Sequence, residues 1–355
     1  MARDEYSCLE KLVEDFLMGP HIYHPSEFWK VINEKNTNWI KEDGLENFKR
    51  SVNNNYFNWM VWFNNDYFWT LCRRYFRSLA RDPLLIRLLF SGSIEEMHSK
   101  TLGHGDHRVS IWEKNIYRIY LMWLYDYVQQ TDPFGLLSTV EEPEIGNPII
   151  CRYKNKRISQ DVCNSYLEYA YIRTSLGDEF KKIDWVAEIG AGYGRLMYLF
   201  AKLHPDKKLI IVDIPPALFI SQWYLGNVFS DKKIMKYCRF EQFCEIEESF
   251  MTSQICFLLP HQLELVPDKS IDLFINISSF HEMKMNQIKR YYDLVDRKGR
   301  FLFTKQWSFW ENAVDRQTMP AVAYPTKSHW ELIAARLDPV HQKFFEALFE
   351  LDPRV

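Results

Sequence analysis

Trp185-Val-Ala-Glu-Ile-Gly-Ala-Gly-Tyr-Gly-Arg195 joins an apolar run to three glycines at alternate positions. The apolar run predicts a buried parallel strand, and apolar residues at helical spacing from Leu196 to Leu203 predict a helix after it. Glycine lets the backbone take positive φ and lets a ligand approach the main chain closely. This stretch therefore indicates a ligand-binding turn between a strand and a helix of an α/β protein.

Two carboxylates near the glycines help to separate the ligand classes that use such a turn. A dinucleotide site has the pattern G-x-G-x-x-G, but Arg195 stands in place of the third glycine here. Glu188, two residues before Gly190, would face a pyrophosphate with like charge, whereas S-adenosylmethionine (SAM) carries an ammonium and a sulfonium there. Asp213 ends a second apolar strand, 25 positions after Glu188, where a carboxylate can bind a ribose diol. The pattern favours SAM over a nicotinamide cofactor, with Gly190, Gly192 and Gly194 around its amino acid end.

Composition excludes several classes of partner. Charged residues make up 26% of the 355 residues and the net charge is −3, which favours neither nucleic acid nor an anionic membrane surface. The seven cysteines are scattered without a C-x-x-C pair, which argues for reduced thiols and against a zinc site. The N-terminus lacks the pattern of a signal peptide, and no apolar run approaches the roughly 20 residues of a membrane span. We therefore expect a cytoplasmic protein.

The first 140 residues predict a helical, aromatic-rich region that serves as a lid, an acceptor-binding part or a homodimer surface. Its densest stretch, 56–69, could stack on a sugar, form a dimer seam or simply be a buried helix. A loop over 94–110 carries four residues of types that bind metals, namely His98, His104, Asp106 and His107. Their spacing matches no familiar metal motif, so we assign no metal and expect a solvated loop that folds over the site. Two turn clusters at 132–135 and 141–148 mark the boundary, and 141–355 forms the second domain.

Strands and helices alternate from residue 184 onward. Apolar strands are expected at 185–189, 209–213, 253–259, 271–279 and 300–305, followed by an antiparallel pair within 330–351. Alternation of this kind predicts a doubly wound, mostly parallel sheet of the Rossmann-like class.

Polar residues just after these strands are the candidates for the site, because α/β proteins bind ligands at the carboxyl ends of parallel strands. His281 follows the fourth strand, and its usual pKa of about 6.5 suits a general base. Glu282 could orient that imidazole, be the base itself or bind a divalent cation. The adenine is expected near Pro260, His261 and Gln262. Further cofactor contacts are assigned to Ile214, Asn276 and Ser278, and an acceptor pocket to Lys305 and Trp307.

Several of these motifs together resemble the bacterial sugar O-methyltransferases, a branch of the SAM-dependent class I methyltransferases. The resemblance rests on Glu188-Ile-Gly-Ala-Gly-Tyr-Gly-Arg195, Ile211-Val-Asp-Ile-Pro-Pro-Ala217, Asp272-Leu-Phe-Ile-Asn-Ile-Ser-Ser-Phe-His-Glu-Met283, Glu144-Ile-Gly-Asn-Pro148, Ile158-Ser-Gln-Asp161, Tyr324-Pro and His329-Trp-Glu-Leu332. It covers about residues 140 to 350. It implies a SAM-binding Rossmann-like fold, a sugar hydroxyl as methyl acceptor and a role in biosynthesis.

The sequence thus predicts an enzyme that transfers a methyl group from SAM to a hydroxyl of a sugar or sugar-containing small molecule, leaving S-adenosylhomocysteine (SAH). The displacement is in line and a general base takes the acceptor's proton. Two alternatives stay open. One is methylation of another small natural-product metabolite on nitrogen, oxygen or a carboxylate. The other is a SAM-binding protein without transferase activity.

Overall fold

The computed structural model describes residues 3–52, 73, 93–94, 98–101, 105–108 and 111–352. Its backbone divides into two compact units that are interleaved along the chain. Unit 1 comprises Met1–Asn38, Ile172–Asp338 and Lys343–Val355, and unit 2 comprises Trp39–Tyr171 and Pro339–Gln342. The sequence suggested one boundary at residue 140, whereas this division assigns the first 38 residues to the same unit as the glycine turn.

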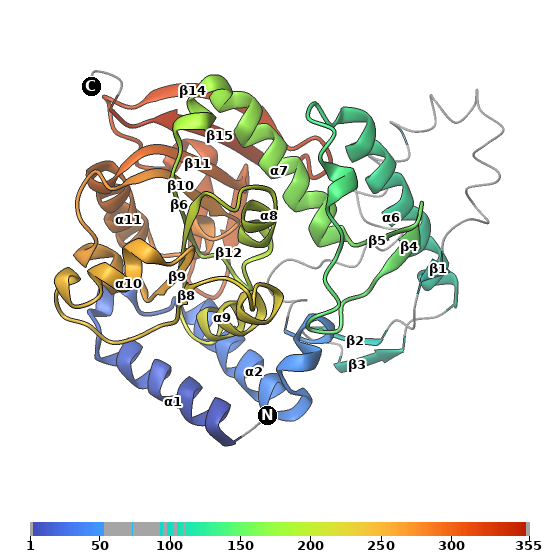
Figure 1. Cartoon of the computed structure of the whole chain (residues 1–355), viewed down its shortest axis with the longest axis horizontal. Helices are drawn as coiled ribbons and strands as arrows, with labels where there is room; N and C mark the ends of the chain where they lie inside the picture. Colours follow the sequence, from blue (N-terminus) through green and yellow to red (C-terminus); the bar gives the residue numbers. More distant parts are fainter. Residues whose placement is uncertain are drawn as a thin grey trace. The chain divides into compact units, whose positions relative to one another are not determined.

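Unit 1 is built on an eight-stranded sheet, which confirms the predicted doubly wound, mostly parallel fold. The strand order is β14-β15-β11-β10-β6-β7-β9-β8, and Figure 1 shows it from β14 at the top to β8 below. The strands are β6 (Trp185–Ile189), β7 (Lys208–Val212), β8 (Ile234–Met235), β9 (Ile255–Leu258), β10 (Ile271–Ile277), β11 (Gly299–Trp307), β14 (Glu331–Leu337) and β15 (Phe344–Glu350). Only β14 and β15 run antiparallel to their neighbours, as expected for the final pair.

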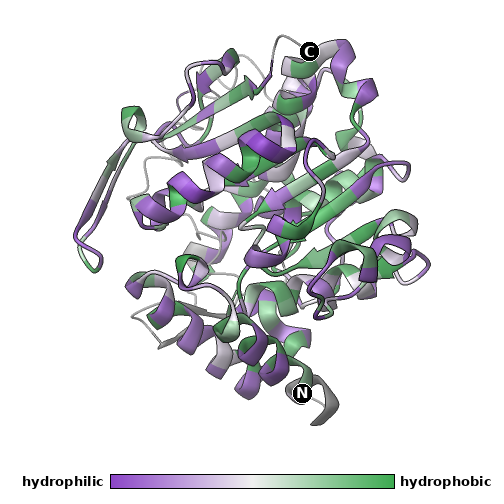
Figure 2. Cartoon of the chain, turned by 90° about the vertical axis from the view of Figure 1, so that its left-hand side faces the viewer, coloured by the Kyte–Doolittle hydropathy of each residue, from purple (hydrophilic) through white to green (hydrophobic). Residues whose placement is uncertain are grey.

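The central strands are buried on both faces, which explains their continuous apolar runs. All four residues of β9 and six of the seven in β10 are buried. In Figure 2 these strands are largely green, while the helices of the unit carry purple on part of their surface. The longer helices are α1 (Arg3–Met18), α2 (Glu27–Asp43, of which 27–38 lie in this unit), α8 (Arg195–Leu203), α9 (Ala217–Val228), α10 (Glu247–Thr252) and α11 (Met285–Lys298).

Short elements connect these strands and helices. The one-turn helices of unit 1 are η1 (His21–Tyr23), η4 (Gly177–Lys182), η5 (Phe243–Glu245), η6 (Pro260–Leu265), η7 (Phe280–Glu282) and η8 (Ala321–Ala323). A hairpin of β12 (Phe309–Asn312) and β13 (Gln317–Pro320) follows β11. The sequence did not predict this hairpin, and it positions two residues of the candidate site.

Unit 2 contains strands as well as the expected helices. Its elements are η2 (Leu45–Arg50), β1 (Ser93–Ile94), β2 (His98–Thr101), β3 (Gly105–Arg108), α6 (Ile111–Thr131), η3 (Leu137–Thr139), β4 (Cys151–Tyr153), β5 (Lys156–Ile158) and the first part of α7 (Gln160–Leu176). The expected loop over 94–110 was wrong for its backbone, because β2 and β3 pair as antiparallel strands. The aromatic stretch 56–69 and His104 lie outside the described residues, as do the side chains of His98, Asp106 and His107.

A buried ion pair organises the region of unit 2 around the predicted domain boundary. Lys49 Nζ lies 2.5 Å from Glu142 Oε1, and both side chains are 2% exposed. Ser159 Oγ donates to the other oxygen of Glu142 at 2.5 Å, just before α7 begins. The start of α7 is therefore fixed to η2 and to the turn cluster at 141–148.

Three further properties of the described residues concern their cysteines, possible metal clusters and possible membrane-spanning helices. The six cysteines that fall within them are free, as expected for reduced thiols. In the same part of the chain, no three His, Cys, Asp or Glu side chains gather in a way that could hold a metal ion. None of the described helices is both long enough and apolar enough to cross a membrane.

Candidate functional site

The order of the strands reverses between β6 and β10. From β6 the chain adds β7 and β9 on one side of the sheet, and then crosses to add β10 and β11 on the other. Open α/β sheets bind ligands at the carboxyl ends of the strands beside such a reversal. The glycine turn after β6 and the segment 276–282 at the end of β10 meet at this point.

The glycine turn has the backbone conformation that its residues predict. Gly190, Gly192 and Gly194 all have positive φ, at 71°, 60° and 84°. A Cβ atom added to Gly190 would lie 2.6 Å from Ser279 Cβ and would also collide with the Ser279 hydroxyl. Glycine is therefore required at position 190 both by backbone conformation and by the approach of the segment after β10.

Asp213 lies where the sequence placed it and closes the glycine turn. Its Oδ2 accepts a hydrogen bond from Gly192 N at 2.7 Å, and its Oδ1 accepts one from Ile214 N at 2.7 Å. Burial raises the pKa of Asp213 to about 7, while the two N–H donors oppose the rise. Since a carboxylate already occupies the Gly192 N–H, this turn is not arranged to bind a phosphate there. Glu188 is buried in β6, where it pairs with Ile211 of β7 and Ile275 of β10.

The three residues predicted near the adenine lie together in η6, but their side chains differ in what they can do. Gln262 is 1% exposed; its Oε1 accepts from Leu259 N at 2.9 Å and its Nε2 donates to Cys238 O at 2.8 Å. Both amide groups bind the main chain, which fixes the Gln262 side chain, and its place near the adenine stays a prediction. His261 Nδ1, in contrast, is buried without a hydrogen-bond partner beside Gly19. Pro260 is the buried first residue of η6.

Asn276, for which a cofactor contact is predicted, makes several hydrogen bonds within the protein. It is fully buried at the end of β10, and its Nδ2 donates to Ile189 O at 2.8 Å. Its Oδ1 accepts from Phe280 N at 3.1 Å and from Gln306 Nε2 at 2.6 Å. Asn276 thus joins the end of β6 to the start of η7. Ser278, two residues on, has a φ of 55° and donates its N–H to Lys305 O at 2.7 Å.

His281 lies in η7 with one ring nitrogen bound and the other without a partner. Its Nδ1 lies 2.9 Å from Gln306 Oε1, and the Gln306 amide is oriented by donating its Nε2 to Asn276 and Thr304. Because Gln306 Oε1 can only accept, the proton lies on Nδ1 and Nε2 carries the lone pair. Nε2 is buried without a hydrogen-bond partner. Burial lowers the pKa of His281 to about 4, against a smaller rise from Gln306, so the imidazole is neutral at pH 7.

Glu282 faces this free nitrogen and is itself held by the N-terminal segment. Its Oε1 lies 3.7 Å from His281 Nε2, too far for a direct hydrogen bond. Its Oε2 accepts from Trp29 Nε1 at 3.0 Å. Burial raises the pKa of Glu282 to about 8, partly offset by the Trp29 hydrogen bond, so the carboxyl group is protonated at pH 7. Oε2 serves as an acceptor, which leaves the proton on Oε1 beside His281.

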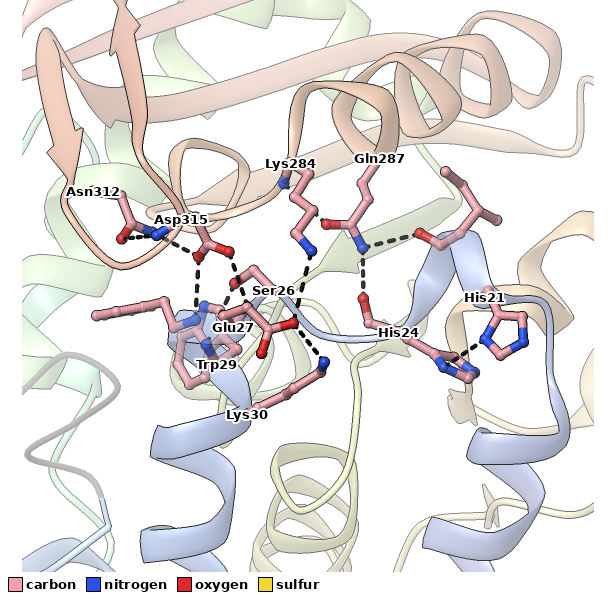
Figure 3. Close-up of polar contacts among 12 residues, drawn as sticks. His21, His24, Ser26, Glu27, Trp29, Lys30, Lys284, Gln287, Asn312 and Asp315 are labelled. Atoms are coloured by element: carbon pink, nitrogen blue, oxygen red, sulfur yellow. Dashed lines mark hydrogen bonds and ion pairs between the residues drawn. The ribbon is translucent and has the colours of Figure 1, made fainter.

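A network of polar contacts fixes the segment that carries Trp29 (Figure 3). Asp315, in the turn of the β12–β13 hairpin, accepts from Glu27 N at 3.0 Å and from Phe28 N at 3.1 Å, which caps the start of α2. Gln287 of α11 donates to Ile22 O and His24 O at 2.9 and 2.7 Å. These bonds hold the first turn of α2 against η7. Neither Trp29 nor Gln306 was identified from the sequence, since each acts through a partner far away in the chain.

Lys305 does not line an acceptor pocket as expected. It is 1% exposed, and its Nζ lies 2.5 Å from Asp338 Oδ2 and 3.7 Å from Glu346 Oε1. Arg336 also contacts Glu346, at 2.6 Å. These ion pairs join β11 to β15 and to the end of β14. Trp307, by contrast, is partly exposed and stacks near Trp310 of the hairpin.

Comparisons with known proteins were made on both sequence and structure. No protein-family model and no curated protein matches the sequence. Among solved structures, the chain is similar to magnesium protoporphyrin IX methyltransferase (ChlM) from Synechocystis PCC 6803 with bound SAH, at 10% identity and a TM-score of 0.36 over 54% of this chain and 85% of that chain. It is also similar to the N-methyltransferase NodS from Bradyrhizobium japonicum WM9 in complex with SAH, at 14% identity and a TM-score of 0.35 over 65% and 99% of the two chains. These values are too low to transfer an activity, so the functional argument depends on the site itself.

Proposed function

We propose that this chain is a methyltransferase that uses SAM and methylates a hydroxyl group of a sugar or a sugar-containing small molecule. One juxtaposition supports this most strongly. At the same edge of the sheet, a glycine turn closed by the Asp213 carboxylate faces a segment whose buried imidazole has a free lone pair. The first feature disfavours a phosphate-bearing cofactor and suits a cationic one with a diol. The second can take a proton from an acceptor.

The residues present fit such a cofactor. Gly190, Gly192 and Gly194 leave the main chain open to its amino acid end, and Glu188 supplies negative charge below them. Asp213 retains lone pairs on both oxygens after accepting its two main-chain bonds, so it can still accept from a ribose diol. His261, with its unpartnered Nδ1, remains a candidate for the adenine side. When bound, SAM supplies an electrophilic methyl group on a sulfonium.

The chain's own chemistry is then limited to positioning and proton transfer. The acceptor hydroxyl donates its hydrogen bond to His281 Nε2, which receives the proton as the oxygen becomes methylated. Gln306 keeps the imidazole in the tautomer that accepts at Nε2. The protonated Glu282 carboxyl donates from Oε1 to the same acceptor oxygen and so orients it. His281 is therefore the base in this proposal and Glu282 is a hydrogen-bond donor.

Calorimetric titration tests the cofactor directly. Purified protein is titrated with SAM, with SAH and with NADH, and the titrations are repeated on Asp213→Ala. We expect micromolar binding of SAM and SAH, no binding of NADH, and a loss of at least about tenfold in affinity in the variant, because a carboxylate hydrogen bond contributes about 1.5–3 kcal/mol. Binding of NADH but not SAH would refute the proposal.

A further inference from the structure

Two orphan polar atoms lie on rings that contact each other beside the proposed base. His281 Nε2 is a hydrogen-bond acceptor and Trp310 Nε1 is a donor, and both are buried without a hydrogen-bond partner. The two rings meet edge to face, with centroids 5.0 Å apart. Buried polar atoms nearly always have partners, and leaving one unpaired costs about 1–3 kcal/mol. Two such atoms of opposite character at one place therefore need an explanation.

Aromatic side chains from β12, α2 and the end of β11 lie around these atoms. Trp310 lies on β12 and contacts Trp307 at 5.5 Å and Phe28 of α2 at 6.4 Å between ring centroids. Trp29 follows Phe28 in the first turn of α2 and donates a hydrogen bond to Glu282. Phe28, Trp29, Trp307 and Trp310 are all partly exposed rather than closed into the core. Partly exposed rings beside polar groups are typical of surfaces that bind ring-shaped ligands.

The hairpin that carries Trp310 also fixes the start of α2, which carries Phe28 and Trp29. Asp315, five residues after Trp310, caps α2 and thereby sets the position of Phe28 and Trp29. Figure 3 shows this cap between the hairpin turn and the first turn of α2. The position of the Trp310 N–H relative to His281 is thus supported by contacts at both ends of the hairpin.

From this arrangement we infer that His281 and Trp310 together form an acceptor subsite for a ring that carries two neighbouring hydroxyl groups. The hydroxyl to be methylated donates to His281 Nε2, and the neighbouring oxygen accepts from Trp310 Nε1. The inference depends on the proposed function, since it names the acceptor class for the same site. Trp310 is a specificity residue in this scheme because it touches the substrate without taking part in proton transfer.

Other acceptor groups satisfy these two atoms less well. An amine is methylated in its neutral form through its single lone pair, so it has no lone pair left to accept from the Trp310 N–H. A carboxylate has only acceptors, so it would leave His281 Nε2 without one. With a single hydroxyl, the methylated oxygen donates its hydrogen to His281 Nε2, uses one lone pair for the methyl group and accepts from Glu282 Oε1 with the other. The Trp310 N–H is then left unpaired, which a site built for hydrogen bonding penalises strongly. Two adjacent hydroxyls supply one donor and one acceptor at once. Because both atoms are buried, a neighbouring side chain must move to admit the ring.

Sugars and catechols both carry neighbouring hydroxyls on a ring, so the experiment has an arm for each. Protein saturated with SAH is titrated by saturation-transfer NMR with the methyl pyranosides of glucose, mannose and galactose and with their monodeoxy derivatives. Catechol is compared with phenol in the second arm. Wild type and Trp310→Phe are measured side by side, since phenylalanine keeps a ring and removes the N–H. Trp330→Phe is the matched control, because Trp330 Nε1 already donates to Asp296 at 2.6 Å.

In wild type and in Trp330→Phe, we expect at least one diol to bind about tenfold more tightly than its deoxy partner, as one buried hydrogen bond predicts. In Trp310→Phe this ratio falls to about one. A preference for the pyranosides identifies a sugar as the acceptor, and a preference for catechol over phenol identifies a catechol. The inference is overturned if SAH binds but no diol is preferred, or if Trp310→Phe keeps the preference. Failure of SAH itself to bind refutes the proposed function instead.

Discussion

The two sides of the candidate site differ in how their polar groups are used. On the cofactor side, both oxygens of Asp213 accept main-chain hydrogen bonds, and Gly190 packs against Ser279 without room for a Cβ. On the acceptor side, His281 Nε2 and Trp310 Nε1 have no hydrogen-bond partner. The polar groups that close the glycine turn at Asp213 are paired within the protein, whereas the two atoms on the acceptor side are without a partner.

This difference predicts whether a substitution will mainly change stability, cofactor affinity or turnover. Changes on the cofactor side disturb contacts that the folded chain already makes, so they should alter stability and cofactor affinity together. Changes on the acceptor side remove atoms that have no partner within the protein, so they should alter turnover more than cofactor affinity. Substitutions at Gly190 test the cofactor side, and substitutions at His281 and Glu282 test the acceptor side.

The largest effect is expected for Gly190→Ala. An alanine there would have a φ of 71° and a Cβ 2.6 Å from Ser279 Cβ. Backbone strain costs about 1–3 kcal/mol and overpacking about 1–3 kcal/mol more. We expect the free energy of unfolding, measured in urea, to fall by about 2–6 kcal/mol, with SAH binding lost in calorimetry.

Gly226→Ala is the matched control for that variant. Gly226 lies within α9, and a Cβ there would meet no atom within 4 Å. Alanine should therefore leave stability unchanged or raise it by about 0.4–1 kcal/mol. If the two glycine variants lose similar stability, the close approach at Gly190 does not matter.

On the acceptor side, His281→Ala should lower turnover by about 100-fold or more, the usual contribution of a general base. The affinity for SAH should stay near the wild-type value, whereas the unfolding free energy should fall by about 1–3 kcal/mol because the buried hydrogen bond to Gln306 is lost. His329→Ala is the control, since His329 lies on the surface and pairs with Asp296. Methyl transfer followed by SAH release measures both variants. Normal turnover in His281→Ala would remove this residue from the mechanism.

The smallest effect near pH 7 is expected for Glu282→Gln, which also decides between two roles for Glu282. Wild-type activity should fall below about pH 4, where His281 gains a proton, and above about pH 8, where Glu282 loses its own. Glutamine keeps a donor but cannot ionise, so the alkaline decline should disappear and the acidic one remain. If Glu282 were the base, this variant would lose turnover at every pH.

Much of unit 1 could be predicted because strand burial leaves a direct signal in the sequence. The apolar runs at β6, β7, β9 and β10 are continuous since both faces of each strand are covered. Glycine spacing likewise reflects local backbone geometry, which explains why Gly190, Gly192 and Gly194 were identified correctly as positive-φ positions.

The polar residues were harder to assign because a polar side chain at a strand end can bind either a ligand or the main chain. Asn276 and Gln262 bind the main chain, and no local pattern distinguishes them from Asp213. Trp29 and Glu282 are 253 residues apart, so their contact has no local signal. The β12–β13 hairpin was missed since its residues show no clear alternation between apolar and polar.

The interleaving of the two units sets an order of events during synthesis. Residues 1–38 leave the ribosome before the rest of unit 1, yet their hydrogen-bond partners in unit 1 include Glu282 and Gln287, more than 250 residues later. Chains are made at about 5–20 residues per second, so this segment waits for roughly 10–50 s before those partners exist. Unit 2 is complete in that interval except for residues 339–342. The segment with Phe28 and Trp29 is thus translated long before the residues that hold it in place beside the acceptor site.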